Sequence, residues 1–120
     1  MIPPLFDVRV RQAPGLAILD LKGEINGSVG PELVAAYAEA VRCDLGGVGL
    51  NFTGINYINS TGIALIVGLL AKARQAHQRI LAYGLNDHYR ELFTITRLVD
   101  LMTVFPDETS ALNQSNPNRT

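Results

Sequence analysis

The chain has 120 residues, of which 48% are hydrophobic and 18% are charged, and its net charge is −1. A chain of this size and composition folds as one domain around its own core and is too apolar to be intrinsically disordered. It carries no basic run that would favour nucleic-acid binding, and residues 63–71 are too short an apolar segment to span a membrane before Lys72.

The N-terminus and the single cysteine bear on the cellular compartment. Residues 1–11 lack the basic start and long apolar run of a secretion signal. Cys43 has no second cysteine for an internal disulfide, and a packing or surface role suits it better than a catalytic one. We therefore expect a cytoplasmic protein.

The first elements form a hairpin. Residues 6–10 alternate apolar and polar side chains, which is the period of a half-buried strand. The Pro14-Gly15 pair indicates a turn, and residues 16–21 read as the returning strand. Residues 6–21 are therefore predicted to pair antiparallel.

A loop over residues 23–28 is expected to lead into the first helix. This helix begins between Ser28 and Glu32, with Pro31 in its first turn and either Ser28 or Gly30 as its N-cap. Its apolar face repeats at helical spacing. The residues of that face are Val29, Leu33, Tyr37 and Val41.

The middle of the chain predicts a strand, a sharp turn and a second helix. Residues 48–52 read as a short central strand, and residues 55–58 are again strand-like. The helix of residues 62–74 is apolar almost all round, so we expect it to be largely buried. Residues 79–83 read as the next strand.

The last third continues the alternation of helices and strands. Asn86 or Asp87 is expected to cap a helix, residues 102–105 form a short strand, and a closing helix runs from Pro106 to about Leu112. The apolar face of the capped helix is made by Leu85, Tyr89, Leu92, Phe93 and Thr96.

These elements predict an α/β domain over residues 1–112, followed by a polar, frayed tail of residues 113–120. Alternating strands and helices favour a parallel sheet, and the opening hairpin makes that sheet mixed. The helices are expected to pack mainly on one face.

The turn at residues 59–62 is the candidate functional site. It follows a central strand and opens a helix, a place where open α/β sheets commonly bind ligands. A helix N-terminus offers free N–H groups and about half a positive charge, so Ser60 is either an N-cap or a place for a phosphate. Gly62 would let the backbone turn sharply and leave the hydroxyl uncovered.

Residues 50–64, with Asn59-Ser60-Thr61-Gly62 at the turn, resemble the signature of the STAS domain family, which includes bacterial anti-sigma factor antagonists. The stretches at residues 21–26 and 85–93 resemble two further family segments. The resemblance covers about residues 6–112 and implies the STAS fold, a mixed sheet with an N-terminal hairpin.

The resemblance also implies a mechanism. An antagonist of this type binds a serine kinase that doubles as an anti-sigma factor, the kinase phosphorylates the position of Ser60, and a PP2C-type phosphatase reverses the modification. Asn26, Asn59, Thr61 and Gly62 would surround the phosphoacceptor and contact the partner. A homodimer is also possible. Thr61 ranks behind Ser60 as an acceptor, with support of the turn as its other role.

Two residues depart from the family pattern. Asn59 and Asn26 stand where the family often has aspartate. Hydrogen bonding by an amide of similar shape persists, but two negative charges beside the acceptor hydroxyl are missing. A kinase that recognises those carboxylates would act poorly on this chain.

An enzyme is the first alternative, and we do not expect it. The turn is not a Gly-x-Ser-x-Gly nucleophile elbow, and His77 and His88 have no spacing that indicates a triad or a zinc site. No metal, cofactor or phosphate-binding loop is indicated.

The second alternative is a STAS module that is not phosphorylated. It would act as a signalling scaffold or as a small cytoplasmic subunit of a lipid or ion transport complex, and the Asn59 departure adds weight to this alternative.

Overall fold

The computed structural model describes residues 5–43 and 45–115. Its strands are β1 (Phe6–Ala13), β2 (Leu16–Ile25), β3 (Val48–Ile58), β4 (Ile80–Tyr83) and β5 (Thr103–Phe105). Its α-helices are α1 (Gly30–Arg42), α2 (Ser60–Gln75), α3 (Asp87–Ile95) and α4 (Glu108–Ser115). Two 3₁₀ turns, η1 (Gly27–Val29) and η2 (Leu98–Asp100), precede α1 and β5.

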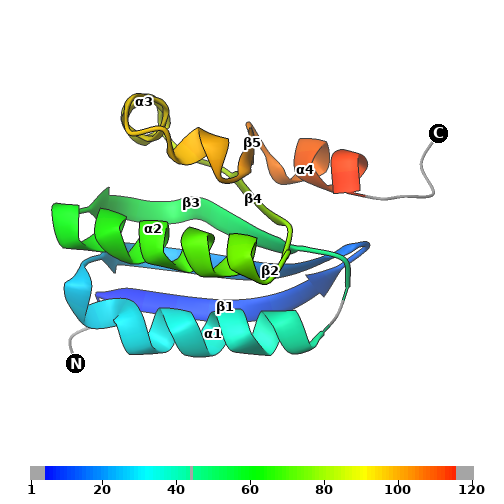
Figure 1. The fold of residues 1–120 in the computed structure, drawn as a ribbon. Helices are drawn as coiled ribbons and strands as arrows, with labels where there is room; N and C mark the ends of the chain where they lie inside the picture. Colours follow the sequence, from blue (N-terminus) through cyan, green and yellow to red (C-terminus); the bar gives the residue numbers. More distant parts are fainter. Residues whose placement is uncertain (1–4, 44, 116–120) are drawn as a thin grey trace.

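The strands form one sheet in the order β1-β2-β3-β4-β5 (Figure 1). β1 pairs antiparallel with β2, and β2 to β5 are parallel to one another. The predicted α/β class, the hairpin and the mixed sheet are thus confirmed.

β2 and β3 are both longer than predicted. β2 continues through Gly23 to Ile25, where the sequence indicated a loop, and β3 runs without interruption to Ile58. The pairing of β2 with β3 shifts register between Asp20 and Lys22 and between Gly23 and Glu24. Such irregularities break the alternation of side chains, which is why the pattern ended both strands too early.

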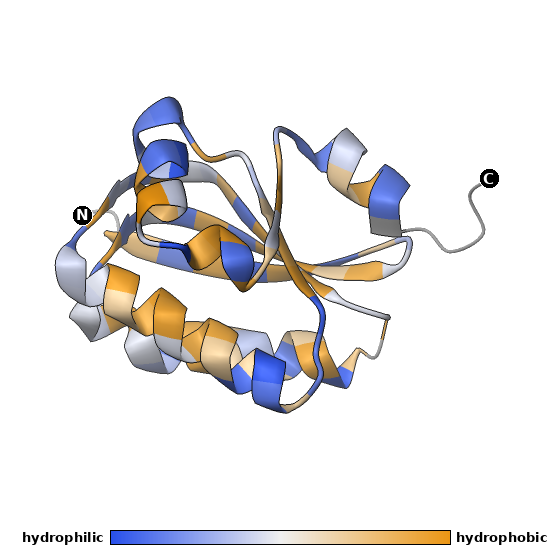
Figure 2. Cartoon of the chain, turned by 45° about the horizontal axis from the view of Figure 1, so that its top comes forward, coloured by the Kyte–Doolittle hydropathy of each residue, from blue (hydrophilic) through white to orange (hydrophobic). Residues whose placement is uncertain are grey.

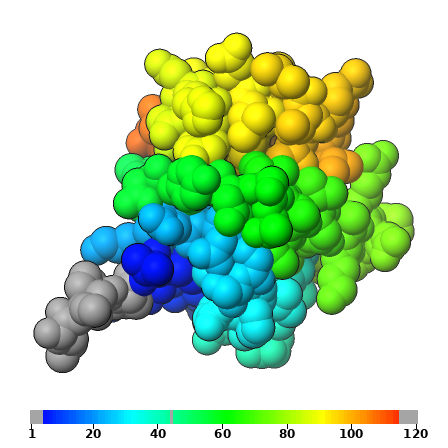
Figure 3. All heavy atoms as spheres, turned by 90° about the vertical axis from the view of Figure 1, so that its left-hand side faces the viewer, coloured from blue at the N-terminus to red at the C-terminus, as the bar shows by residue number. Residues whose placement is uncertain are grey.

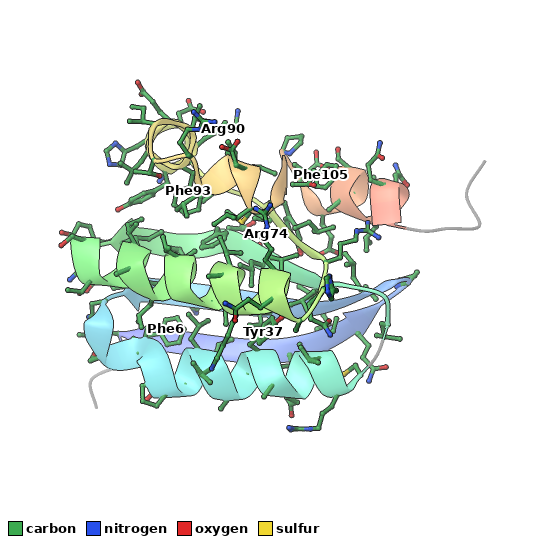
Figure 4. All side chains as sticks on the ribbon, viewed as in Figure 1. Phe6, Tyr37, Arg74, Arg90, Phe93 and Phe105 are labelled. Atoms are coloured by element: carbon green, nitrogen blue, oxygen red, sulfur yellow. The ribbon has the colours of Figure 1, made fainter. Side chains whose placement is uncertain are left out.

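The main core lies between the sheet and the first three helices. Leu33 of α1, Ile66 of α2 and Phe93 of α3 belong to one buried cluster with the apolar side chains of β2 and β3. Phe93 points from α3 toward the sheet (Figure 4), and its ring meets that of Phe52 edge-on, with centroids 5.8 Å apart. The predicted packing of the helices mainly on one face is confirmed.

α4 covers part of the opposite face. Its Ala111 is buried against Leu16, Ile18, Leu81 and Tyr83. Polar contacts at the start of α4 hold it there, as described next.

Glu108 of α4 joins three elements across this second face. Its carboxylate accepts hydrogen bonds from Arg11 of β1 at 2.6 Å and from the Tyr83 hydroxyl of β4 at 2.6 Å. Arg11 also donates to Asp20 of β2 at 2.8 Å. The hydrogen bond from Arg11 holds the pKa of both carboxyl groups below their ordinary values, and the hydrogen bond from Tyr83 lowers the pKa of Glu108 further.

α4 ends at Ser115, later than the predicted end near Leu112. The division into a domain of residues 1–112 and a tail of 113–120 stays a prediction, because residues 1–4 and 116–120 lie outside the described residues.

Candidate functional site

The candidate site lies at the edge of the sheet where β2 and β3 end. Ile25 and Ile58 are register partners, so the parallel strands deliver Asn26 and Asn59 to the same edge. Figure 3 shows this face, with the light-blue residues that lead into α1 lying against the green residues of the β3–α2 junction. All five predicted site residues therefore lie in two adjoining segments.

Asn59 is the N-cap of α2. Its Oδ1 accepts hydrogen bonds from the Gly62 N–H and from the Thr61 hydroxyl, both at 2.8 Å. Of the two roles that the sequence left open for Ser60, that of the N-cap is wrong, because Ser60 is the first residue of the helix. The amide oxygen makes the bonds that an aspartate carboxylate would make here, without its charge.

Thr61 connects the two segments. Its Oγ1 accepts a hydrogen bond from the Gly27 N–H at 2.9 Å while it donates to Asn59. A Cβ on Gly27 would lie 3.2 Å from the Thr61 side chain, so the two turns are closely packed. Thr61 thus supports the turn, the structural role that the sequence left open for it.

Asn26 fixes the turn on the other side. Its Oδ1 accepts hydrogen bonds from the Ser28 N–H at 2.8 Å and the Ser28 hydroxyl at 2.5 Å. It therefore caps η1, and α1 follows directly from that turn with Val29 at its N-cap position and no side-chain cap. The expected cap of α1 by Ser28 or Gly30 is wrong, because the 3₁₀ turn leads into α1.

Gly62 is needed for packing and not for a sharp turn. It lies in the first turn of α2, and a Cβ there would lie 2.7 Å from the carbonyl carbon of Ile25 and closer still to its oxygen. Only glycine lets α2 start this near the end of β2. The expectation that Gly62 turns the backbone is corrected accordingly.

Ser60 is exposed, and it makes no hydrogen bond through its hydroxyl or its N–H within the part of the chain that the structure describes. The Thr61 N–H is likewise without a hydrogen-bond partner there. The first turn of α2 holds no acidic residue. The positive end of a 16-residue helix therefore faces an uncovered hydroxyl.

An exposed apolar strip extends from Ser60 along α2. The prediction that this helix is largely buried is wrong for one side. Ile66, Leu69 and Leu70 face the core, whereas the other side is open to solvent. This strip, hereafter the α2 strip, is made by Ala64, Val67, Gly68 and Ala71.

The α2 strip borders a groove against α1. The groove has a volume of about 310 Å³ and is lined by Leu65 and Gly68 of α2 and Val34 of α1, among others. Val34 is 47% exposed and Val67 is 39% exposed. Figure 2 shows the apolar colouring that runs along α2. The small residues of α2 were the signal in the sequence that could have indicated this exposed surface. It was missed because the helix is apolar on all sides.

Tyr89 is a positioning residue that the sequence assigned only to the core. Its hydroxyl accepts a hydrogen bond from the Ile58 N–H at 2.8 Å, so α3 fixes the last residue of β3 just before the turn. His88 packs edge-on against the Tyr89 ring, with centroids 4.8 Å apart. Neither His88 nor His77 is hydrogen-bonded to Ser60 in the described structure.

Two features are absent from residues 5–43 and 45–115. Within these residues no three His, Cys, Asp or Glu side chains gather in a way that would hold a metal ion. No helix among them has the length and apolar character needed to cross a membrane.

Comparison with known proteins places this geometry in a family. Residues 7–111 match the STAS domain. The "Anti-sigma-B factor antagonist" of Staphylococcus aureus (strain NCTC 8325 / PS 47) is 32% identical over 82 residues, which cover 68% of this chain and 76% of that protein.

Solved structures agree on the fold. An anti-sigma factor antagonist from Mycobacterium paratuberculosis superimposes with a TM-score of 0.77 at 16% identity, covering 92% of this chain and 93% of that one. The Bacillus cell fate determinant SpoIIAA in its phosphorylated form gives a TM-score of 0.66 at 16% identity, covering 90% and 98%. The chain therefore belongs to the STAS domain family, as an anti-sigma factor antagonist-like member.

Proposed function

We propose that this chain binds an anti-sigma factor that is also a serine kinase, and that phosphorylation of Ser60 releases that partner. The observation that carries the proposal is the uncovered hydroxyl of Ser60 at the head of the exposed α2 strip. The name of the Staphylococcus aureus relative, an antagonist of an anti-sigma factor, supports the choice of partner.

The α2 strip is the proposed contact surface. An apolar surface of small residues lets a partner approach the helix closely, and Val34 and Val67 supply side chains for burial. Ser60 lies at the end of this strip, so a bound partner would cover or border its hydroxyl. Asn26, Asn59, Thr61 and Gly62 hold the turn that presents it.

The proposed switch acts through charge. The Ser60 oxygen takes the γ-phosphoryl group of ATP, ADP leaves, and the hydroxyl proton passes to the kinase. The new group carries about −1.5 to −2 charges at neutral pH. Within this domain the free N–H groups of Ser60 and Thr61 and the helix dipole support that charge, whereas a dry apolar interface disfavours it. A PP2C-type phosphatase would restore binding.

A solved structure of SpoIIAA in a phosphorylated form, which shares this fold, supports the proposal that such a domain accommodates a phosphoryl group. In our chain Asn59 presents an amide beside Ser60, so the phosphoryl group would meet no neighbouring carboxylate on that side. The domain thus tolerates the charge, while a kinase that reads an aspartate at this position would need another contact.

The test uses tagged wild-type, Ser60→Ala and Ser60→Asp chains incubated in cytosol of the source cells, with and without ATP. Captured proteins and phosphorylated peptides are identified by mass spectrometry. We expect phosphate on Ser60, retention of the kinase by Ser60→Ala and its loss with Ser60→Asp. Thr109→Asp, which adds the same charge in the first turn of α4, is the matched control and should retain the partner.

The second candidate function is a constitutive binding module, either a signalling scaffold or a small cytoplasmic subunit of a transport complex. The amides at Asn26 and Asn59 favour it, since both replace expected carboxylates. In the same experiment this module would show unmodified Ser60 in both samples, with a partner still bound. Equal binding by Ser60→Asp and the wild type would rule out the charge switch.

A further inference from the structure

β1 is a long, regular edge strand that is neither shortened nor bent, and of the features that protect an edge it has only the charges of Asp7, Arg9 and Arg11. Its eight residues pair with β2 without a register shift, and it contains neither proline nor lysine. The other edge, β5, has three residues and is followed by Pro106. Monomeric proteins shorten, bend or charge their exposed edges, because a regular edge strand is a template for pairing with another chain.

The backbone groups on the outer side of β1 are free within the described structure. The Leu5 carbonyl accepts a hydrogen bond from the Glu24 N–H. The backbone N–H and C=O groups of the odd-numbered residues of β1 therefore point toward β2. Antiparallel strands alternate, and the N–H and C=O groups of Phe6, Val8 and Val10 therefore point outward. No backbone partner is found for them in residues 5–43 and 45–115.

α1 does not close this edge. The side chains of Phe6, Val8 and Val10 are only partly buried against the main core. A shallow hollow of about 490 Å³ lies beside the second half of the strand, lined by Val10 and Gln12 of β1 and by Glu39 and Arg42 of α1. A second strand can therefore reach the outer side of β1.

The side chains of β1 are complementary to a second copy of the same strand. In a two-fold antiparallel pair centred on Val8, Asp7 of each copy lies opposite Arg9 of the other, and Phe6 lies opposite Val10. Asp7 and Arg9 are 48% and 83% exposed, respectively, and their contact within one chain is a single 3.5 Å ion pair. Both are available to a partner strand.

The neighbouring registers do not share this complementarity. Two-fold pairing centred on Asp7 or on Arg9 places that charged residue opposite its own copy, so like charges meet. Centring on Val10 places Arg9 opposite Arg11. The register centred on Val8 is the one of these four in which opposite charges meet and the apolar side chains face one another.

We propose that this edge is a homodimer interface, in which β1 pairs antiparallel with β1 of a second copy, centred on Val8. The sheets of the two copies become one continuous sheet. In the sheet, β2 separates this edge from β3 and the β3–α2 junction, so the interface leaves the Ser60 site of each copy accessible. The proposal does not depend on the proposed switch.

The test is sedimentation of the full chain over a concentration series, with three variants. Asp7→Arg and Arg9→Asp each replace two attractive pairs by two like-charged pairs, and each should raise the dimer dissociation constant about tenfold or more. An equimolar mixture of the two variants should dimerise again, because positions 7 and 9 are both basic in one variant and both acidic in the other. The double variant Asp7→Arg with Arg9→Asp should dimerise as well, since it only exchanges the two charges.

Arg90→Asp on α3 is the charge control and should leave the dimer unchanged, since Arg90 is exposed on another element. The mixing experiment also separates charge from folding, because an unfolded variant cannot recover in the mixture. A monomeric wild type at every concentration would overturn the proposal. So would single variants that dimerise like the wild type, or a mixture that stays monomeric.

Discussion

Gly62→Ala tests the packing that places the candidate site. An added methyl group would lie 2.7 Å from the carbonyl carbon of Ile25 and closer still to its oxygen. Both atoms belong to the backbone of β2, so no side-chain rotation relieves the clash and α2 must move. Overpacking of this kind costs about 1–3 kcal/mol or more, while replacing glycine by alanine in a helix returns about 1 kcal/mol.

The clashing atoms are backbone atoms far inside contact distance, so the cost lies at the upper end of that range. After the gain in helix propensity is subtracted, we expect Gly62→Ala to lower the free energy of unfolding by about 2 kcal/mol. With an m-value of about 1 kcal/mol per M, the urea midpoint measured by circular dichroism would fall by about 2 M. Gly68→Ala is the matched control in the same helix, because nothing lies within 4 Å of its added methyl group. It should gain about 0.5–1 kcal/mol. A Gly62→Ala chain as stable as the wild type would refute the close approach of α2 to β2.

Two other predictions concern the cap and the second face. Asn59→Ala should lower the free energy of unfolding, measured in urea, by about 1 kcal/mol because the Gly62 N–H loses its acceptor. Asn59→Asp should be at least as stable as the wild type. Equal stability of all three chains would contradict the cap. Glu108→Gln should lose about 0.5–1 kcal/mol at neutral pH. Since the folded pKa of Glu108 is depressed, its contribution is present above the unfolded pKa and vanishes as the pH falls through the folded value, so the two unfolding midpoints should converge in acid.

The order and type of the elements followed from local patterns in the sequence. Pro14-Gly15 marked the hairpin, and of the two predicted cap candidates Asn86 and Asp87 it is Asn86 whose side chain accepts from the Tyr89 N–H. These signals are local: a few residues decide the backbone conformation. The turn at residues 59–62 was located by the same reasoning.

The features of the site that could not be predicted from the sequence depend on contacts between distant segments of the chain. Position 62 must be glycine because the Ile25 carbonyl, 37 residues earlier in the chain, leaves no room for a Cβ. The hydrogen bond from Gly27 to Thr61 and the support of β3 by Tyr89 are likewise tertiary. The exposed side of α2 could not be read from hydrophobicity, because a helix that is apolar all round does not tell which side is covered.

The cap of α2 explains why the hydroxyl of Ser60 is available. In a helix that begins with an asparagine followed by a serine, either side chain can satisfy the first N–H groups. Here the Asn59 oxygen accepts from the Gly62 N–H and the Thr61 hydroxyl, and the Ser60 hydroxyl makes no hydrogen bond to any residue that the structure describes. An aspartate at position 59 would make the same bonds and add one negative charge. The exchange of Asp for Asn therefore leaves the geometry of the acceptor intact and changes only the electrostatics that a kinase meets. Comparing phosphorylation of the wild type and Asn59→Asp by one kinase would measure that charge alone.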